Sequence, residues 1–151
     1  MRQFVCPACG AANRVPEARD ASAAKCGRCA RRLFEGQPVE VTSTQLESHR
    51  RSTKGAALML DVWAPWCGPC RAMAPQFAAA AARLEPHVRL LKLNSDQYPE
   101  AAQALGVQGI PALFLIEDGR IVARHAGLMS TQQLIAFARQ AQAVQTAEGA
   151  R

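Results

Sequence analysis

The order of apolar and polar positions predicts strands that alternate with helices from about residue 38 onward. The run AALMLDVW at 56–63 is mostly apolar and is typical of a strand buried in the centre of a sheet. Residues 67–85 are alanine-rich and helical in pattern, and Pro75 within them predicts a kink. The other expected elements are strands at 38–42 and 87–94, two strands within 112–127, and helices at 44–52, 99–106 and 130–144.

Local signals indicate where two of these elements begin or turn. Thr44 followed by Glu47 has the pattern of a capping box, so we expect a helix to begin there. Asp118-Gly119 between two apolar runs predicts a two-residue hairpin turn. Strand–helix–strand units followed by a hairpin imply an α/β fold with a mixed sheet and helices on both of its faces.

The first part of the chain differs from the rest, because it is rich in Ala, Arg and Cys and has no long apolar run. We therefore expect a small module over 1–35, a larger domain over 36–147 and a loose tail over 148–151. A module of this size buries too little apolar surface to be stable alone, so a metal ion is the expected reinforcement.

Composition and charge narrow the class of protein only slightly. Of 151 residues, 49% are hydrophobic, which excludes a disordered chain. No apolar run approaches the roughly 20 residues of a membrane span. The N-terminus lacks the pattern of a secretory signal, so we expect a cytoplasmic protein. The net charge of +6 is concentrated in the module, where it indicates either solvated charge or a nucleic-acid or acidic partner.

Six cysteines form three Cys-x-x-Cys pairs, and the first two pairs have the spacing of a four-thiolate zinc site. Each two-residue spacer lets a tight turn direct both sulfurs at one ion, and two such turns complete a tetrahedron. The expected ligands are Cys6, Cys9, Cys26 and Cys29. Four protein ligands leave no open position, so the Zn²⁺ is expected to be structural. The alternatives are two disulfides or free thiols in a disordered tail.

The third pair, Cys67 and Cys70, opens a helix directly after the buried strand at 56–63. Unpaired N–H groups and a partial positive charge at a helix N-terminus favour a thiolate at Cys67, and a thiolate attacks disulfides. Cys70 lies one turn further on, where it can resolve the mixed disulfide. Gly68 permits a tight turn, and Pro69 costs no helical hydrogen bond in the first turn. The alternatives are half of a zinc site or two inert core cysteines.

These motifs carry a family resemblance. WCGPC at 66–70, KLNSDQ at 92–97 and GVQGIPALFLIEDGR at 106–120 resemble the thioredoxin family over about residues 38–146. With the four-cysteine module, the whole chain is similar to the zinc-containing bacterial thioredoxin 2 subgroup. The resemblance implies a thioredoxin fold, with a sheet of about five strands flanked by about four helices. It also implies reduction of protein disulfides, recharging by an NADPH-dependent thioredoxin reductase, and no tightly bound organic cofactor.

The resemblance also assigns roles to residues around the dithiol. Cys67 would be the attacking thiol and Cys70 the resolving thiol. Ile110-Pro111 matches the family's cis-proline loop, whose backbone would receive an extended substrate segment as an added strand. The expected substrate-contacting residues are Trp66, Gly68, Pro69, Ile110 and Pro111. Gly127 matches a family glycine near the substrate groove, although a structural turn explains it nearly as well.

Asp61 is anomalous on physical grounds alone, because a charged carboxylate is costly inside a strand as apolar as LMLDVW. Either this side chain faces solvent at the strand end, or it is buried and accepts a proton from the Cys70 thiol. Lys92 lies where the family places a lysine partner of this aspartate, and the alternative is an exposed strand lysine. Both catalytic roles follow from the resemblance.

Two other functions remain open at the level of sequence. A disulfide oxidase or isomerase would use the same dithiol in the opposite direction, because direction depends on redox potential and compartment. A zinc-ribbon binding protein would use the basic module on nucleic acid or on a protein, with the second domain as a scaffold. The intact pair Cys67/Cys70 argues against this binding protein, and a membrane partner is not expected.

Overall fold

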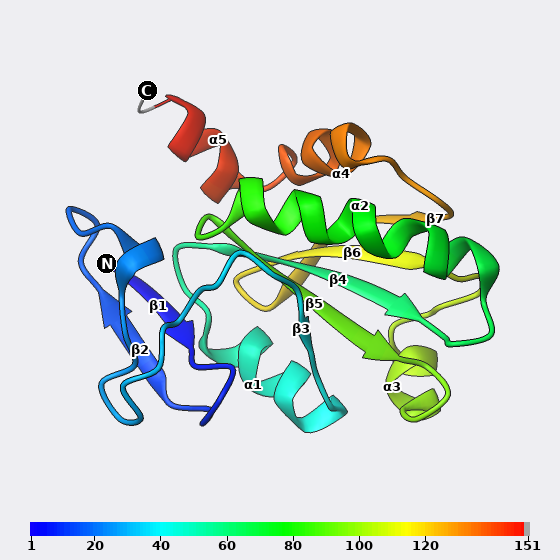
Figure 1. Cartoon of the computed structure of the whole chain (residues 1–151), viewed down its shortest axis with the longest axis horizontal. Helices are drawn as coiled ribbons and strands as arrows, with labels where there is room; N and C mark the ends of the chain where they lie inside the picture. Colours follow the sequence, from blue (N-terminus) through cyan, green and yellow to red (C-terminus); the bar gives the residue numbers. More distant parts are fainter. Residues whose placement is uncertain (150–151) are drawn as a thin grey trace.

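A five-stranded mixed sheet organises the chain in the computed structural model, which describes residues 1–149 (Figure 1). The strand order is β3-β5-β4-β6-β7, in which β3, β5 and β4 are parallel, β6 is antiparallel to β4, and β7 is antiparallel to β6. The strands are β3 Val39–Glu40, β4 Ala57–Trp63, β5 Val88–Asn94, β6 Ala112–Glu117 and β7 Arg120–Ala126. The helices are α1 Ser43–Ser52, α2 Gly68–Leu84, α3 Pro99–Ala104, α4 Thr131–Ala138 and α5 Gln142–Gly149. The expected α/β class and mixed sheet are confirmed.

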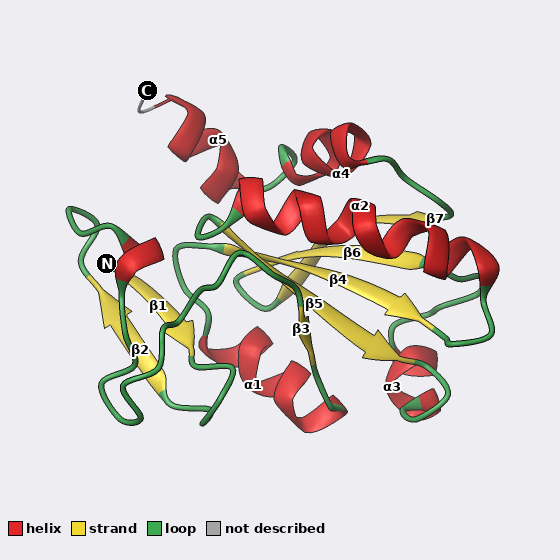
Figure 2. Cartoon of the chain, viewed as in Figure 1, coloured by secondary structure: helices red, strands yellow, loops and turns green. Residues whose placement is uncertain are grey.

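Helices cover both faces of this sheet, as Figure 2 shows. Alternate residues of the central strand β4 point to opposite faces. Met59 packs with Phe77 of α2 in one core, and Leu60 packs with Leu46 of α1 in the other. Every residue of β4 from Ala57 to Val62 is buried, which explains its continuous apolar sequence.

The hairpin was predicted correctly, whereas the start of α1 was not. Asp118 and Gly119 have φ of 53° and 77°, the left-handed pair that a two-residue turn of this kind requires. Helix α1 begins at Ser43, and its N-cap is Thr42 rather than Thr44. The Thr42 side chain accepts the Gln45 backbone N–H, and the Gln45 side chain accepts the Thr42 N–H. Overlapping capping patterns made the choice ambiguous in the sequence.

The expected single helix at 130–144 is two helices, α4 and α5, so the prediction is wrong at this point. The Glu117 carboxylate, at the end of β6, accepts the backbone N–H groups of Gln142 and Ala143 at 2.9 and 2.8 Å. This distant cap starts a new helix that continues to Gly149, where we expected a loose tail. Residues 150 and 151 lie outside the described residues.

The N-terminal module is a two-stranded sheet, β1 Arg2–Val5 and β2 Ala12–Val15, followed by a 3-10 turn at Ala21–Ala23. Backbone hydrogen bonds join Gln3 to Lys54, just after α1. The Arg89 guanidinium donates to the Leu33 carbonyl at 2.7 Å and lies 4.0 Å from the centre of the Phe34 ring. The module is therefore packed onto the larger domain rather than tethered to it.

This module lies at the end of the molecule where α2 finishes (Figure 1). The Glu85 carboxylate, at the C-cap of α2, accepts the Gly36 N–H at 3.0 Å. A helix of 17 residues is about 25 Å long. The first turn of α2 is consequently remote from the module.

Candidate active site and metal centre

Cys67 and Cys70 form a disulfide at the start of α2, with Cα atoms 5.2 Å apart. Strand β4 delivers the chain to this point, and Cys67 is the N-cap of the helix. The Cys70 backbone N–H donates to Cys67 Sγ at 3.2 Å. An N–H group at a helix N-terminus stabilises negative charge, so this geometry favours a thiolate on Cys67 once the disulfide is reduced.

The loop before β6 lies against this disulfide. The Ile110–Pro111 peptide bond is cis, as expected. The Ile110 carbonyl oxygen is 3.8 Å from Cys67 Sγ, and Ile110 packs against the cluster formed by Ala64, Cys67 and Cys70. Gly127, at φ 116°, donates its N–H to the Pro111 carbonyl at 2.8 Å. Gly127 thus has a structural role in holding this loop.

Trp66 stands at the surface beside the dithiol and is 67% exposed. Its indole Nε1 donates to Asp96 Oδ1 at 3.1 Å, which fixes the ring. An added Cβ at Gly68 would meet no atom within 4 Å, so the face above the disulfide is open here. A fixed aromatic ring beside open backbone is suited to receive a polypeptide segment.

Asp61 is buried beneath this surface, with 1% of its area exposed. The alternative of a solvent-facing carboxylate is therefore wrong. Neither carboxylate oxygen receives a hydrogen bond from the residues that the structure describes. Burial raises the pKa of Asp61 to about 7, against an opposing effect of Lys92 and with a further increase from Glu40. A carboxyl group with such a pKa exchanges protons near neutral pH.

Lys92 is paired with Asp61 across β4 and β5, as partners in the parallel register. Its ammonium lies 4.9 Å from the centre of the Trp63 ring, a cation–π contact. The Trp63 Nε1 donates to Glu40 Oε2 at 3.3 Å. Lys92 is half-buried, so the alternative of an exposed strand lysine does not hold.

The four N-terminal cysteines meet at one point, with their sulfur atoms all within 4.8 Å of one another. Cys6 and Cys29 sulfurs are 3.6 Å apart, and so are those of Cys9 and Cys26. Sulfurs about 2.3 Å from a tetrahedral zinc ion would be about 3.8 Å apart, so these residues fit Zn²⁺.

Neighbouring groups favour the ionised form of Cys26, whereas the pKa of Cys9 is raised to about 11, because the backbone hydrogen bond of Ala11 is outweighed by burial and by the other three thiols. The backbone N–H of Cys29, the Asn13 amide and the backbone N–H of Arg28 lower the pKa of the Cys26 thiol. Asn13 Nδ2 lies 3.4 Å from Cys26 Sγ, and Asn13 Oδ1 accepts the Gly27 N–H. These contacts orient a ligand, as residues around metal sites commonly do.

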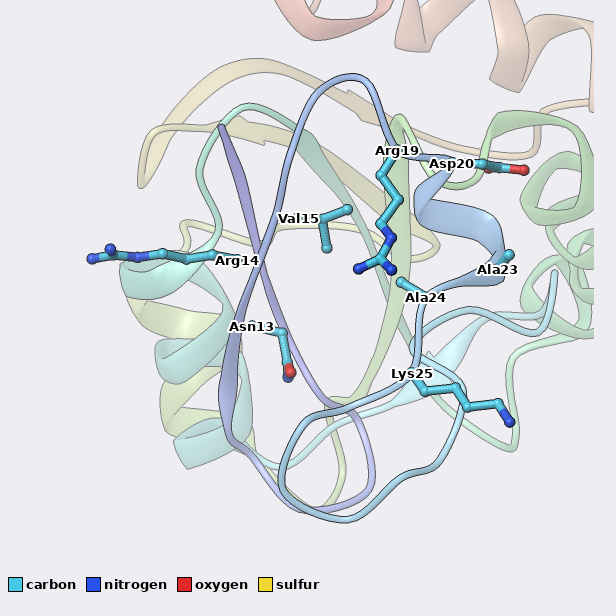
Figure 3. A pocket seen from close by; sticks show the side chains of 8 residues that line it. All are labelled: Asn13, Arg14, Val15, Arg19, Asp20, Ala23, Ala24 and Lys25. Atoms are coloured by element: carbon cyan, nitrogen blue, oxygen red, sulfur yellow. The ribbon is translucent and has the colours of Figure 1, made fainter.

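The three basic side chains at the cavity of the module do not converge on one point. A cavity of about 510 Å³ lies between β2 and the segment at 19–25. Figure 3 shows Arg19 pointing into it, whereas Arg14 and Lys25 point away. Recognition of phosphate requires several donors directed at one place, so this cavity offers no support for a nucleic-acid site.

Residues 37–140 match the protein family described as "Thioredoxin". The chain belongs to the thioredoxin family. Residues 5–31 match a second family, described as "Thioredoxin 2, N-terminal", which is a zinc ribbon. The two matches together cover the dithiol site and the four-cysteine cluster of this thioredoxin.

Similar proteins agree with this assignment. Thioredoxin C-3 of Corynebacterium nephridii is 38% identical over 131 residues, which span 87% of this chain and 89% of that protein. A thioredoxin of Pseudomonas aeruginosa is 37% identical over 99 residues, or 66% of this chain and 91% of that one. Among solved structures, a mutant thioredoxin from Halobacterium salinarum has a TM-score of 0.63 and 27% identity, covering 70% of this chain and 91% of its own.

This thioredoxin is accordingly a thiol–disulfide oxidoreductase that acts on protein disulfides. Its four clustered cysteines agree with the zinc-ribbon match. No helix within residues 1–149 is long and apolar enough to cross a membrane.

Three polar residues at these sites were missed by reasoning from sequence: Glu40, Asp96 and Asn13. Asp96 could have been predicted, because it follows β5, and the carboxyl ends of neighbouring parallel strands meet at one edge of a sheet. Glu40 sits on a two-residue strand whose register is set by distant β5. Asn13 precedes its partner Cys26 by thirteen positions, and no local pattern links them.

Proposed function

We propose that this thioredoxin reduces protein disulfides by dithiol exchange through Cys67-Gly68-Pro69-Cys70. The Cys67 thiolate attacks one sulfur of the target disulfide, forms a mixed disulfide and releases the other target sulfur as a thiolate. Cys70 then attacks Cys67 Sγ, which frees the second target sulfur and leaves Cys67–Cys70 oxidised. The target gains the two electrons that the dithiol loses. The Cys70 N–H directed at Cys67 Sγ supports Cys67 as the first nucleophile.

In this mechanism Asp61 accepts the proton of Cys70 before the second attack. The thiol must ionise to become a nucleophile, and a base is most useful when its pKa is near the working pH. The pKa of about 7 that burial produces at Asp61 supports this role. Lys92, its register partner, would stabilise the carboxylate between turnovers.

Trp66, Gly68, Pro69, Ile110 and Pro111 are proposed to contact the substrate. A target segment in extended form would pair with the Ile110 backbone, as a strand adds to a sheet edge. The proximity of the Ile110 backbone to Cys67 Sγ supports this placement, because it brings such a segment to the disulfide.

An NADPH-dependent thioredoxin reductase in the cytoplasm is the proposed source of electrons for the oxidised protein. The family implies this partner in general, and no organic cofactor is part of the proposal.

One Zn²⁺ is proposed to be held by Cys6, Cys9, Cys26 and Cys29. Bound there, it would cross-link the two cysteine turns and supply folding energy rather than chemistry, since four thiolates fill a tetrahedron. The position of the module at the far end of α2 supports a role separate from the redox reaction (Figure 1).

The observation that carries the proposal is the Cys67–Cys70 disulfide at the start of α2, next to the Ile110–Pro111 loop. Its test is insulin reduction with NADPH and thioredoxin reductase, comparing the wild type with Cys67→Ser and Cys70→Ser. We expect turnover to vanish in both variants, with Cys67→Ser unable to form a mixed disulfide. Bound zinc, counted on the same samples, should stay at one ion per chain. A zinc-loaded, folded wild type without turnover would contradict the reductase and favour the oxidase.

A further inference from the structure

Three charged residues stand in one row across the sheet at the active-site end. Glu40 of β3 is the register partner of Lys92 of β5, and Lys92 is the register partner of Asp61 of β4. Partners in a parallel ladder direct their side chains to the same face. One cation is thus placed between two carboxyl groups.

Trp63 connects this row to the dithiol. It lies two residues after Asp61 on the same strand, and therefore on the same face. Its indole Nε1 donates to Glu40 at 3.3 Å, its ring lies under the Lys92 ammonium, and it packs against the cluster of Cys67 and Cys70. Glu40 holds the only polar atom of the Trp63 side chain, so it fixes the ring that Lys92 rests on.

The electrostatic effects of this row on Asp61 have opposite signs. Lys92 lowers the pKa of Asp61 and Glu40 raises it, and among the described residues these are the two charged groups that act on the buried carboxyl. Glu40 itself has a raised pKa because of its partial burial, although the Trp63 hydrogen bond and Lys92 oppose that increase. Glu40 and Asp61 flank Lys92 in the sheet register and therefore compete for the same cation.

We propose that Glu40 is a positioning residue of this active site. It holds the Trp63 ring against Lys92, and its negative charge weakens the electrostatic effect of Lys92 on Asp61. The inference rests on the proposed function, in which Asp61 accepts the Cys70 proton. Without Glu40, Asp61 would receive the whole effect of Lys92 and would become a weaker base. The residue at position 40 thereby sets the pH range over which Cys70 attacks the mixed disulfide.

The direct test is the titration of Asp61 in the zinc-loaded, oxidised full chain, followed by the NMR signal of its ¹³C-labelled carboxyl carbon. In the wild type we expect a midpoint of about 7. Glu40→Gln should move the midpoint down by about half a pH unit, roughly a threefold change in the acid dissociation constant. Glu40→Asp, which keeps the charge, should move it less.

Glu47→Gln is the matched control, because Glu47 is exposed on α1 and should leave the Asp61 midpoint unchanged. An Asp61 midpoint in Glu40→Gln equal to that of the wild type would overturn the proposal.

A kinetic measurement separates positioning from a purely structural effect. The acid limb of the pH profile of insulin reduction should move to lower pH in Glu40→Gln by the same half unit or so. Asp61→Asn and the double variant Glu40→Gln/Asp61→Asn should have the same profile as each other, because Glu40 acts through Asp61. A further shift in the double variant would overturn the proposal. If the wild type lacked reductase activity, the proposed function would fail, and the titration would still decide whether Glu40 controls Asp61.

Discussion

Asp61 places a titratable group inside the core of the protein, and this has a consequence for stability. Its pKa in the folded protein is about 7, against an ordinary value of 3.8. Between these two values the folded protein retains a proton that the unfolded chain releases, so the contribution of Asp61 to stability falls as the pH rises through this window. Above pH 7 the folded protein holds a buried carboxylate with no hydrogen-bond donor among the described residues.

Asp61→Asn should therefore stabilise the oxidised protein in a pH-dependent way. We expect a gain of about 2–4 kcal/mol at pH 8 and little gain at pH 4, where the wild-type carboxyl is neutral in the folded state and only about half ionised in the unfolded chain. Urea unfolding of both proteins at the two pH values measures this difference. An equal gain in the free energy of unfolding at pH 4 and pH 8 would show that packing, and not ionisation of Asp61, causes the stabilisation. The insulin reduction rate should fall, because the variant lacks the proposed base.

At the scale of elements, Arg89 of β5 joins the nearby end of α2 to the module, which is more than fifty residues away in sequence. Its guanidinium lies 3.7 Å from the Glu85 carboxylate at the end of α2, with both side chains 3% exposed, and it also contacts Leu33 and Phe34. Burial raises the pKa of Glu85 to about 7, and Arg89 counteracts this. Glu85 and Arg89 thus neutralise each other's charge at the buried point where α2, β5 and the module meet.

Arg89→Ala should destabilise the protein by about 3–5 kcal/mol at pH 9, because it leaves a buried carboxylate without its cation. The cost should be smaller at pH 6, where Glu85 can take up a proton in the folded state. Arg83→Ala, at an exposed position in the last turn of α2, is the control and should change stability little. Denaturant unfolding at the two pH values tests this, and a cost independent of pH would contradict the role of Glu85.

At the scale of the whole molecule, the two parts differ in how they are stabilised. The larger domain has a core on each face of its sheet. The module has one small cluster, formed around Phe4, Leu33 and Phe34, in which two of the proposed zinc ligands are themselves core residues. Its stability should therefore depend on the metal, whereas that of the larger domain should not.

Removal of zinc from the reduced full chain with a chelator should unfold the module selectively. We expect amide hydrogen exchange in residues 2–34 to approach unprotected rates, while protection in β4, β5 and α2 and most of the reductase activity are retained. Hydrogen exchange by mass spectrometry measures this, and readdition of zinc should restore protection. Loss of protection throughout the chain would show instead that the two parts unfold as one unit.

Much of this protein was readable from the sequence by local rules. The apolar run at 56–63, the turn at Asp118-Gly119 and the cysteine spacings each depend on neighbours in the chain. The structure confirms the fold class and brings the four N-terminal sulfurs together as their spacing predicts. The boundary of α5 failed because a distant residue, Glu117, decides it, whereas the start of α1 failed because two capping patterns overlap locally.

Sequence by itself determined the chemistry available to this protein, because a Cys-x-x-Cys pair at a helix start and an aspartate in an apolar strand are local facts. Only the tertiary structure decided how that chemistry is tuned. The row of Glu40, Lys92 and Asp61 depends on the register of three strands from separate parts of the chain. The same holds for Arg89 with Leu33 and Phe34, because only folding brings these groups together.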